Sequence, residues 1–111
     1  MSDTVVWVVL VTTDTAESAR KLARIVVQGG YAACVNIVPG VTSVYVWEGV
    51  EREETEHLLV IKTTPARYPA LEEVIRKHHP YTTPEILALT SCAVSPAYAN
   101  WVHQQCKEVP T

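Results

Sequence analysis

The amino-acid sequence predicts an α+β fold, because extended apolar segments alternate along the chain with segments of helical periodicity. Three observations carry this prediction. The first apolar run is continuous and β-branched, later runs place apolar residues three and four apart, and glycine or proline punctuates the junctions. With 111 residues the chain is long enough for one compact core, so we expect a single domain over residues 1–111.

The first two elements are a strand and a helix. The segment Val5–Thr12 (VVWVVLVT) is apolar and β-branched, which is typical of a strand covered on both faces. Asp14 and Glu17 stand at the spacing of a capping box, and apolar residues then recur at helical spacing. The pair Gly29-Gly30 predicts the end of this helix, because glycine is the usual C-cap residue.

A long β-hairpin follows. Ala32–Trp47 and Glu51–Thr64 predict two strands joined by a turn at Glu48-Gly49, with a bulge or kink at Pro39-Gly40. A strand of about 14 residues spans roughly 45 Å, whereas a helix of about 14 residues covers only about 20 Å. About half of the hairpin should therefore project beyond the helices, and its apolar residues favour burial against another subunit.

The remaining elements complete the pattern. We expect a second helix between Pro65 and Lys77, a strand over Glu85–Val94, and a last helix that begins at Ser95-Pro96. The order is then β-α-β-β-α-β plus a C-terminal helix, which is the split βαβ or ferredoxin-like sandwich. Right-handed crossovers place both main helices on one face of an antiparallel sheet.

The segment between the second helix and the last strand concentrates chemically active side chains. It reads His78-His79-Pro80-Tyr81-Thr82-Thr83-Pro84-Glu85, and its prolines stiffen the connection. Neutral imidazole binds zinc and copper well. Two adjacent histidines cannot complete a site that usually needs about four ligands, so further ligands would come from elsewhere in the chain or from another copy.

Composition and motifs exclude several classes of function. The net charge is -3 without a basic stripe, which excludes an electrostatic case for nucleic acid or an anionic membrane. The sequence shows no spanning apolar run, and we expect no signal peptide because the N-terminal residues lack a basic region. The well-separated Cys34, Cys92 and Cys106 favour reduced, small buried thiols. We therefore expect a cytoplasmic protein. Neither a nucleophile motif nor a phosphate-binding loop is present, so we expect neither catalysis nor an organic cofactor.

At several points the sequence resembles the CutA family, the so-called divalent-cation tolerance proteins. The matching motifs are Ala32-Ala33-Cys34-Val35-Asn36-Ile37, Ser43-Val44-Tyr45-Val46-Trp47-Glu48-Gly49, Ile61-Lys62-Thr63, His79-Pro80-Tyr81, Pro84-Glu85 and Tyr98-x-x-Trp101. The resemblance implies a ferredoxin-like fold, a homotrimer joined through long strands, and binding of copper or another divalent metal. It also implies an architecture related to the PII signalling trimers.

The metal ligands implied by the resemblance transfer only in part. His78 and His79 match the family's histidine pair, and we expect His79 as the main ligand with His78 as helper. The family's first-strand cysteine falls on Val11, which has no ligand atom. Weak binding of Cu(II) or Zn(II) is therefore expected rather than binding of Cu(I), which prefers thiolate. The alternative is structural: a partly buried His78 and a His79 that caps the helix.

Other residues have two interpretations each. Tyr81 and Glu85 either supply oxygen ligands and orient an imidazole, or form hydrogen bonds between subunits. Lys62 either has a functional role, by pairing with Glu85 or binding an anion in a cleft, or forms a simple structural ion pair. Large aromatic residues of this kind are more often interface than cofactor platforms, which assigns Tyr45, Trp47 and Trp101 to the interface. The acidic run at the hairpin tip is expected to be a solvated face: Glu48, Glu51, Glu53, Glu54 and Glu56.

Two functions follow from the sequence. The first is a non-enzymatic, homotrimeric protein that binds divalent copper or zinc and contributes to metal tolerance. The alternative is a PII-like small-molecule sensor or scaffold, with an unknown ligand in a cleft between subunits and structural histidines.

Overall fold

The predicted order of helices and strands is confirmed by the computed structural model, which describes residues 5–107. Two long strands in the middle of the chain form the hairpin, and the last helix follows the fourth strand. The elements are β1 (Trp7–Thr13), α1 (Ala16–Gln28), β2 (Cys34–Trp47), β3 (Val50–Thr63), α2 (Tyr68–His78), β4 (Ile86–Thr90) and α3 (Pro96–Gln105).

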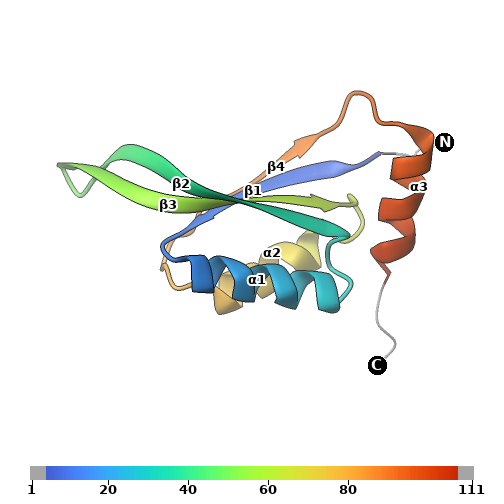
Figure 1. Cartoon of the computed structure of the whole chain (residues 1–111), viewed down its shortest axis with the longest axis horizontal. Coiled ribbons are helices and arrows are strands. Elements are labelled where there is room, and N and C mark those ends of the chain that lie inside the picture. The colour runs from blue at the N-terminus through green and yellow to red at the C-terminus, as the bar shows by residue number, and fades with distance from the viewer. Residues whose placement is uncertain (1–4, 108–111) are drawn as a thin grey trace.

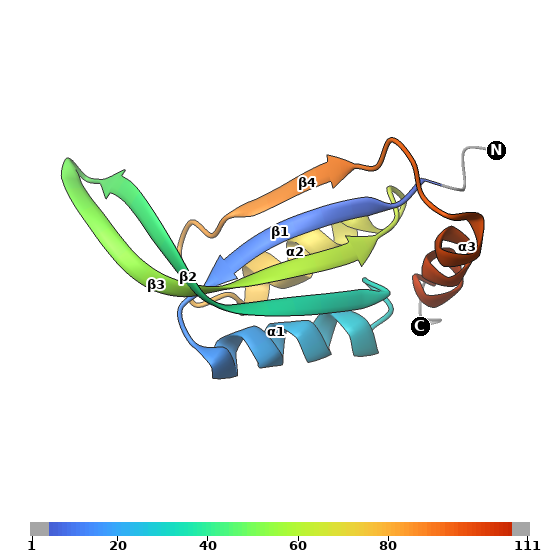
Figure 2. The same cartoon turned by 45° about the horizontal axis from the view of Figure 1, so that its top comes forward.

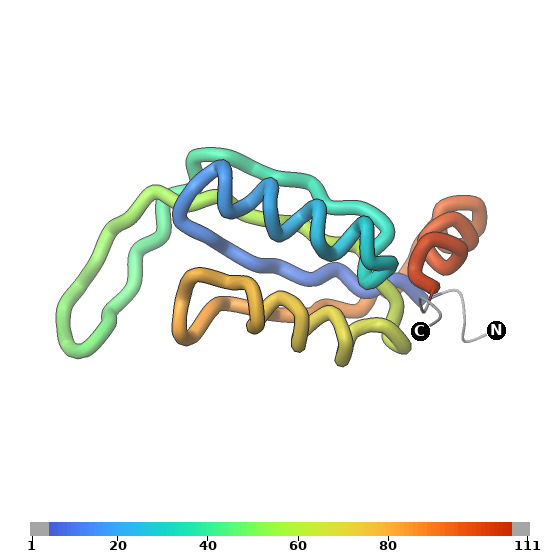
Figure 3. The backbone as a smooth tube through the Cα atoms, turned by 90° about the horizontal axis from the view of Figure 1, so that it is seen from below, coloured from blue at the N-terminus to red at the C-terminus, as the bar shows by residue number. Residues whose placement is uncertain are grey.

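The four strands form one antiparallel sheet in the order β2-β3-β1-β4. This order gives the ferredoxin-like arrangement, because α1 and α2 each carry the chain from one strand across to another. Both helices lie side by side on the same face of the sheet (Figures 1 and 3). Helix α3 lies at the end of the sheet away from the hairpin tip (Figure 1).

The main core fills the space between the sheet and helices α1 and α2. Alternate residues of β1, including Val9 and Val11, point into it and are fully buried. The helices contribute Leu22, Leu71 and Ile75 among others. Full burial of one such aliphatic side chain is worth about 1.5–3 kcal/mol, so this layer holds the subunit together.

The helix starts follow the expected cap chemistry, with one correction. Thr15 rather than Asp14 caps α1, since its hydroxyl accepts the backbone N–H of Ser18 at 3.0 Å. Thr15 has the extended backbone (φ -126°) that an N-cap residue needs. Helix α2 begins at Tyr68 with Pro69 in its first turn, and Ser95 caps α3 as predicted.

Strand β4 is shorter than the predicted Glu85–Val94. It pairs only with β1, from Ile86 opposite Val11 to Thr90 opposite Trp7. One more backbone hydrogen bond follows, from the Ser91 N–H to the Val6 carbonyl (3.1 Å), and the chain then turns toward α3. The extended run stops there because the neighbouring strand has ended.

The hairpin projects as predicted. Residues His57–Thr63 of β3 pair with β1, whereas the outer residues Val50–Glu56 pair with β2 alone. A bulge interrupts the pairing between Val38 and Val41, and the hairpin bends away from the sheet (Figure 2). Glu48 (φ 51°) and Gly49 (φ 79°) form the two-residue turn, because such turns need positive φ at both positions.

The sheet face opposite α1 and α2, called here the open face, is mostly aliphatic. No helix among residues 5–107 lies over its centre (Figure 1). Strand β1 was expected to be covered on both faces, but its second face has no cover from residues 5–107. Leu87 and Leu89 are 52% and 48% exposed there. The other aliphatic members are Val8, Leu10, Val38, Leu58 and Val60.

The three cysteines are free thiols, as expected, but only Cys106 is buried, while Cys34 is partly buried and Cys92 exposed. The expectation of a buried thiol is therefore wrong for Cys92, which lies in the connection between β4 and α3. No helix within the described range of 5–107 is both long and apolar enough to cross a membrane.

Candidate functional site

His79 is buried and held by both of its ring nitrogens. Only 8% of its surface is exposed. Its Nδ1 accepts the backbone N–H of Tyr81 at 3.0 Å, so Nε2 carries the proton and donates it to the Thr12 carbonyl at 2.8 Å. The rings of His79 and Tyr81 also pack with centroids 4.8 Å apart. His79 thus ties the end of α2 to the end of β1 as a neutral imidazole, with neither nitrogen free for a metal in this arrangement.

His78 lies in the opposite environment. The apolar stripe of α2 predicts a partly buried ring, but His78 is exposed at the last helical position. The inward position passes to His79 because the backbone becomes extended there (ψ 140°). His78 follows Arg76 and Lys77 in the last turn, where positive charge suits the helix dipole.

The metal-binding pattern is therefore incomplete in one chain. Val11, at the position where the resemblance implies a cysteine, is fully buried in the main core. Within residues 5–107, no group of three or more histidine, cysteine, aspartate or glutamate side chains could hold a metal ion. A metal at His78 would need further ligands from another copy or from water.

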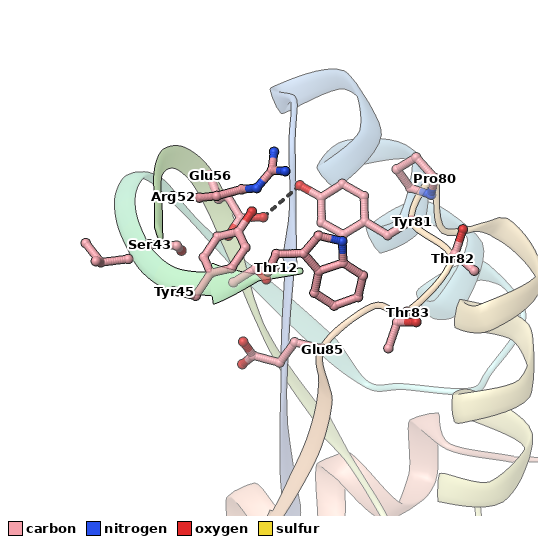
Figure 4. A pocket seen from close by; sticks show the side chains of 12 residues that line it. Thr12, Ser43, Tyr45, Arg52, Glu56, Pro80, Tyr81, Thr82, Thr83 and Glu85 are labelled. Atoms are coloured by element: carbon pink, nitrogen blue, oxygen red, sulfur yellow. Dashed lines mark hydrogen bonds between the residues drawn. The ribbon is translucent and has the colours of Figure 1, made fainter. Parts of the chain in front are cut away.

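A pocket of about 760 Å³, called here the hairpin pocket, lies between the projecting hairpin and the loop after α2 (Figure 4). The predicted residues Tyr81 and Glu85 line it. So do two of the predicted interface aromatics, Tyr45 and Trp47. Its other lining residues are Thr12, Ser43, Val44, Arg52, Glu56, Pro80, Thr82 and Thr83.

Glu56 is the residue that the sequence interpretation misplaced. It was assigned to the solvated acidic face, yet it is only 6% exposed and accepts the Tyr81 hydroxyl at 2.7 Å (Figure 4). Burial, with this hydrogen bond and the carboxylate charge, raises the pKa of the Tyr81 hydroxyl far above its usual value near 10. Strand alternation was the available signal, since Glu56 shares a face with the aliphatic Leu58 and Val60.

Lys62 does not meet Glu85 in the structure. It lies on the open face opposite Val8 of β1, where its ammonium contacts the side-chain oxygen of Asn36. Glu85 precedes β4, whose residue opposite Val8 is Leu89, four positions further along. The two side chains therefore belong to opposite ends of the sheet, so the alternative of an ion pair within one chain is wrong.

The three predicted interface aromatics are partly exposed in the single chain. Tyr45 is 37% exposed, Trp47 47% and Trp101 41%. Tyr45 donates a hydrogen bond to Glu54 on the outer hairpin, and Trp101 packs beside Tyr98 on α3 with ring centroids 5.9 Å apart. Tyr45 and Trp47 belong to the projecting hairpin, whereas Trp101 lies on α3 at the other end of the molecule (Figure 1). The hairpin aromatics and Trp101 would therefore serve different contacts.

Comparison with known proteins gives a consistent result. A family model described as "CutA1 divalent ion tolerance protein" matches residues 7–105. The "Divalent-cation tolerance protein CutA" of Thermus thermophilus is 45% identical over 97 residues, covering 87% of this chain and 94% of that protein. "Protein CutA, chloroplastic" of Arabidopsis thaliana is 44% identical over 95 residues, covering 86% of this chain and about half (52%) of that longer protein.

The solved structure of CutA1 from Oryza sativa superposes with a TM-score of 0.92 at 37% identity, covering 98% of this chain and 100% of that one. Sequence and fold therefore agree with these relatives over nearly the whole chain. The chain belongs to the CutA1 divalent ion tolerance family.

Proposed function

We propose that this chain acts in divalent-cation tolerance as a homotrimer whose subunits meet through the open face. The aliphatic open face is the observation that carries this proposal. An exposed aliphatic sheet face of this kind is costly in water and marks an interaction surface. The projecting hairpin and the exposed rings of Tyr45, Trp47 and Trp101 supply additional contact surface. The number three comes from the family resemblance.

We further propose weak binding of Cu(II) or Zn(II). His78 is the accessible histidine, whereas His79 would first have to release Thr12 and Tyr81. His78 therefore replaces His79 as the first ligand, with other ligands from a second copy or water. Affinity should be lower in acid than at neutral pH, because protonated imidazole cannot bind a metal.

Isothermal titration of the metal-stripped protein with Cu(II) and Zn(II) tests this binding. His78→Ala should weaken it about tenfold or more, whereas Lys77→Ala, a neighbouring exposed change, should leave it unchanged. Equal binding by the parent and His78→Ala would show that the metal site lies elsewhere.

The second candidate is a PII-like small-molecule sensor, and the hairpin pocket favours it. A volume of about 760 Å³ is within the range of about 300–1,000 Å³ that is usual for small-molecule sites. Both functions are proposed to operate without catalysis or nucleic acid. The proposed cytoplasmic location remains a prediction, since the Arabidopsis relative is called chloroplastic.

A further inference from the structure

Charged side chains on the open face are separated by sign along the sheet. Lys62, near the end of β3, lies at the end of the sheet beside α3. Glu56 and Glu85 lie at the other end, where both line the hairpin pocket. The surface between the two ends is mostly aliphatic and includes Leu87 and Leu89. The open face is therefore complementary in charge to that of a second copy that meets it head to tail.

Lys62 has no carboxylate partner among residues 5–107. In that range the one ion pair joins Arg76 to Glu72 on α2. The Lys62 ammonium contacts the side-chain oxygen of Asn36, which carries no net charge. Lys62 is already partly buried in the single chain, and a second copy over the open face would bury it further. A buried ammonium group is costly unless an opposite charge lies beside it, so the neighbouring copy should supply a carboxylate.

Glu85 is the carboxylate best placed for this role. Glu56 already accepts the Tyr81 hydroxyl and shares the pocket lining with Arg52. Glu85 is exposed just before β4, and Figure 4 shows its carboxylate lying apart from Arg52 and Tyr81. It is therefore accessible to a charge that arrives from outside the chain.

The symmetry of a trimer brings opposite ends of the open face together. Contacts around a threefold axis are head to tail, so each copy presents one part of its surface to a different part of the next copy. We propose that, in the homotrimer, Lys62 of one subunit forms an ion pair with Glu85 of the partner subunit. The pair sets the direction in which the subunits follow one another. It rests on the first proposed function, because it names the polar contact that accompanies burial of the open face.

A charge swap in the full chain tests this ion pair. Lys62→Glu and Glu85→Lys should each weaken assembly about tenfold or more, because each places two like charges together in the contact. The double variant that combines both reversals restores opposite charges and should assemble nearly as the parent does. Sedimentation velocity in a urea series, at one protein concentration, measures the urea concentration at which each trimer dissociates.

Matched controls come from the exposed surface of α2, away from the open face. Lys77→Glu and Glu73→Lys should dissociate at the urea concentration of the parent. If the parent is a trimer and the double variant dissociates as readily as the single reversals, the ion pair is overturned while the open-face trimer stands. The same conclusion follows if either single reversal leaves assembly unchanged. A parent that sediments as a stable monomer overturns both proposals.

The parent protein offers a second measurement that does not depend on how a variant folds. A carbodiimide joins an amine to a carboxylate without a spacer, so it links groups that are in contact. Treatment of trimers assembled from isotope-labelled and unlabelled chains should join Lys62 to Glu85 in peptide pairs that contain both isotopes. Mass spectrometry identifies these pairs. Cross-linked trimers in which Lys62 is joined to a different carboxylate would contradict the proposed pair.

Discussion

At the residue scale, two adjacent histidines have different roles. His78 is the last residue of α2 and faces solvent, whereas His79 has left the helix with an extended backbone (ψ 140°) and is buried. The histidine pair was visible in the sequence, but which ring points inward depends on where α2 ends and how the chain leaves it. Glu56 shows the same limit, because its partner Tyr81 is 25 residues away and no local pattern links them.

Replacing His79 should destabilise the fold far more than replacing His78. His79→Ala removes a buried ring and two hydrogen bonds, which should cost about 2–4 kcal/mol of unfolding free energy. His78→Ala changes an exposed side chain and should cost less than about 0.5 kcal/mol. Urea unfolding of both variants at one protein concentration measures the difference. Equal losses of unfolding free energy in the two variants would show that the hydrogen bonds of His79 to Thr12 and Tyr81 do not stabilise the fold.

Tyr81 should make stability fall at alkaline pH. Its folded pKa is raised above the unfolded value of about 10, so its contribution is complete below pH 10 and is lost as the pH rises above it. Tyr81→Phe should lose about 1–3 kcal/mol at pH 7, because Glu56 loses its donor, and should then show a shallower alkaline decline than the parent. Unfolding curves between pH 7 and 11 measure both effects. If the stability of both proteins fell with the same slope at alkaline pH, the decline would have to come from groups other than Tyr81.

At the element scale, local sequence signals predicted most of the helix and strand boundaries. The bulge at Pro39-Gly40, the turn at Glu48-Gly49 and the helix stop at Gly29 were all read from glycine and proline positions. The end of β4 was not, because it depends on where its only partner β1 ends. Where a strand ends depends on the distant strand that it pairs with, and the pattern of a single sequence does not show that pairing.

Shortening the hairpin should disrupt assembly before it disrupts the subunit. Replacing residues 45–52 with Asn-Gly keeps Val44 opposite Glu53 and removes the end of the hairpin, which pairs with no other strand, while the main core residues stay. The variant should keep its helical circular dichroism but dissociate toward monomers at micromolar concentration. Sedimentation velocity follows the mass. An assembly of unchanged subunit number and melting temperature would contradict a role for the outer hairpin in association.

At the scale of the whole molecule, one face of the sheet is closed by helices and the other is open. Chain length predicted a single compact domain, and the long hairpin predicted a partner subunit. The extent of the aliphatic open face emerged only when the register placed residues of four strands on one surface. A copy of the chain covering this surface would bury it and add mass-action stabilisation.

A charge on the open face should therefore prevent association. Leu87→Lys places an ammonium group on the open face, where burial of an unpaired charge in the proposed contact is strongly unfavourable. Val27→Lys is the matched control, since Val27 is an exposed aliphatic residue (41%) on α1, away from the open face. Size-exclusion chromatography should show a smaller species for Leu87→Lys alone. Loss of assembly in both variants would indicate a non-specific effect of charge.

Burial of the open face between copies of this chain is the central claim, and sedimentation equilibrium of the parent protein tests it most directly. The measured mass at micromolar concentration should be three times the 12.3 kDa of one chain and should change little with dilution. A stable species of 12.3 kDa under the same conditions would contradict the claim.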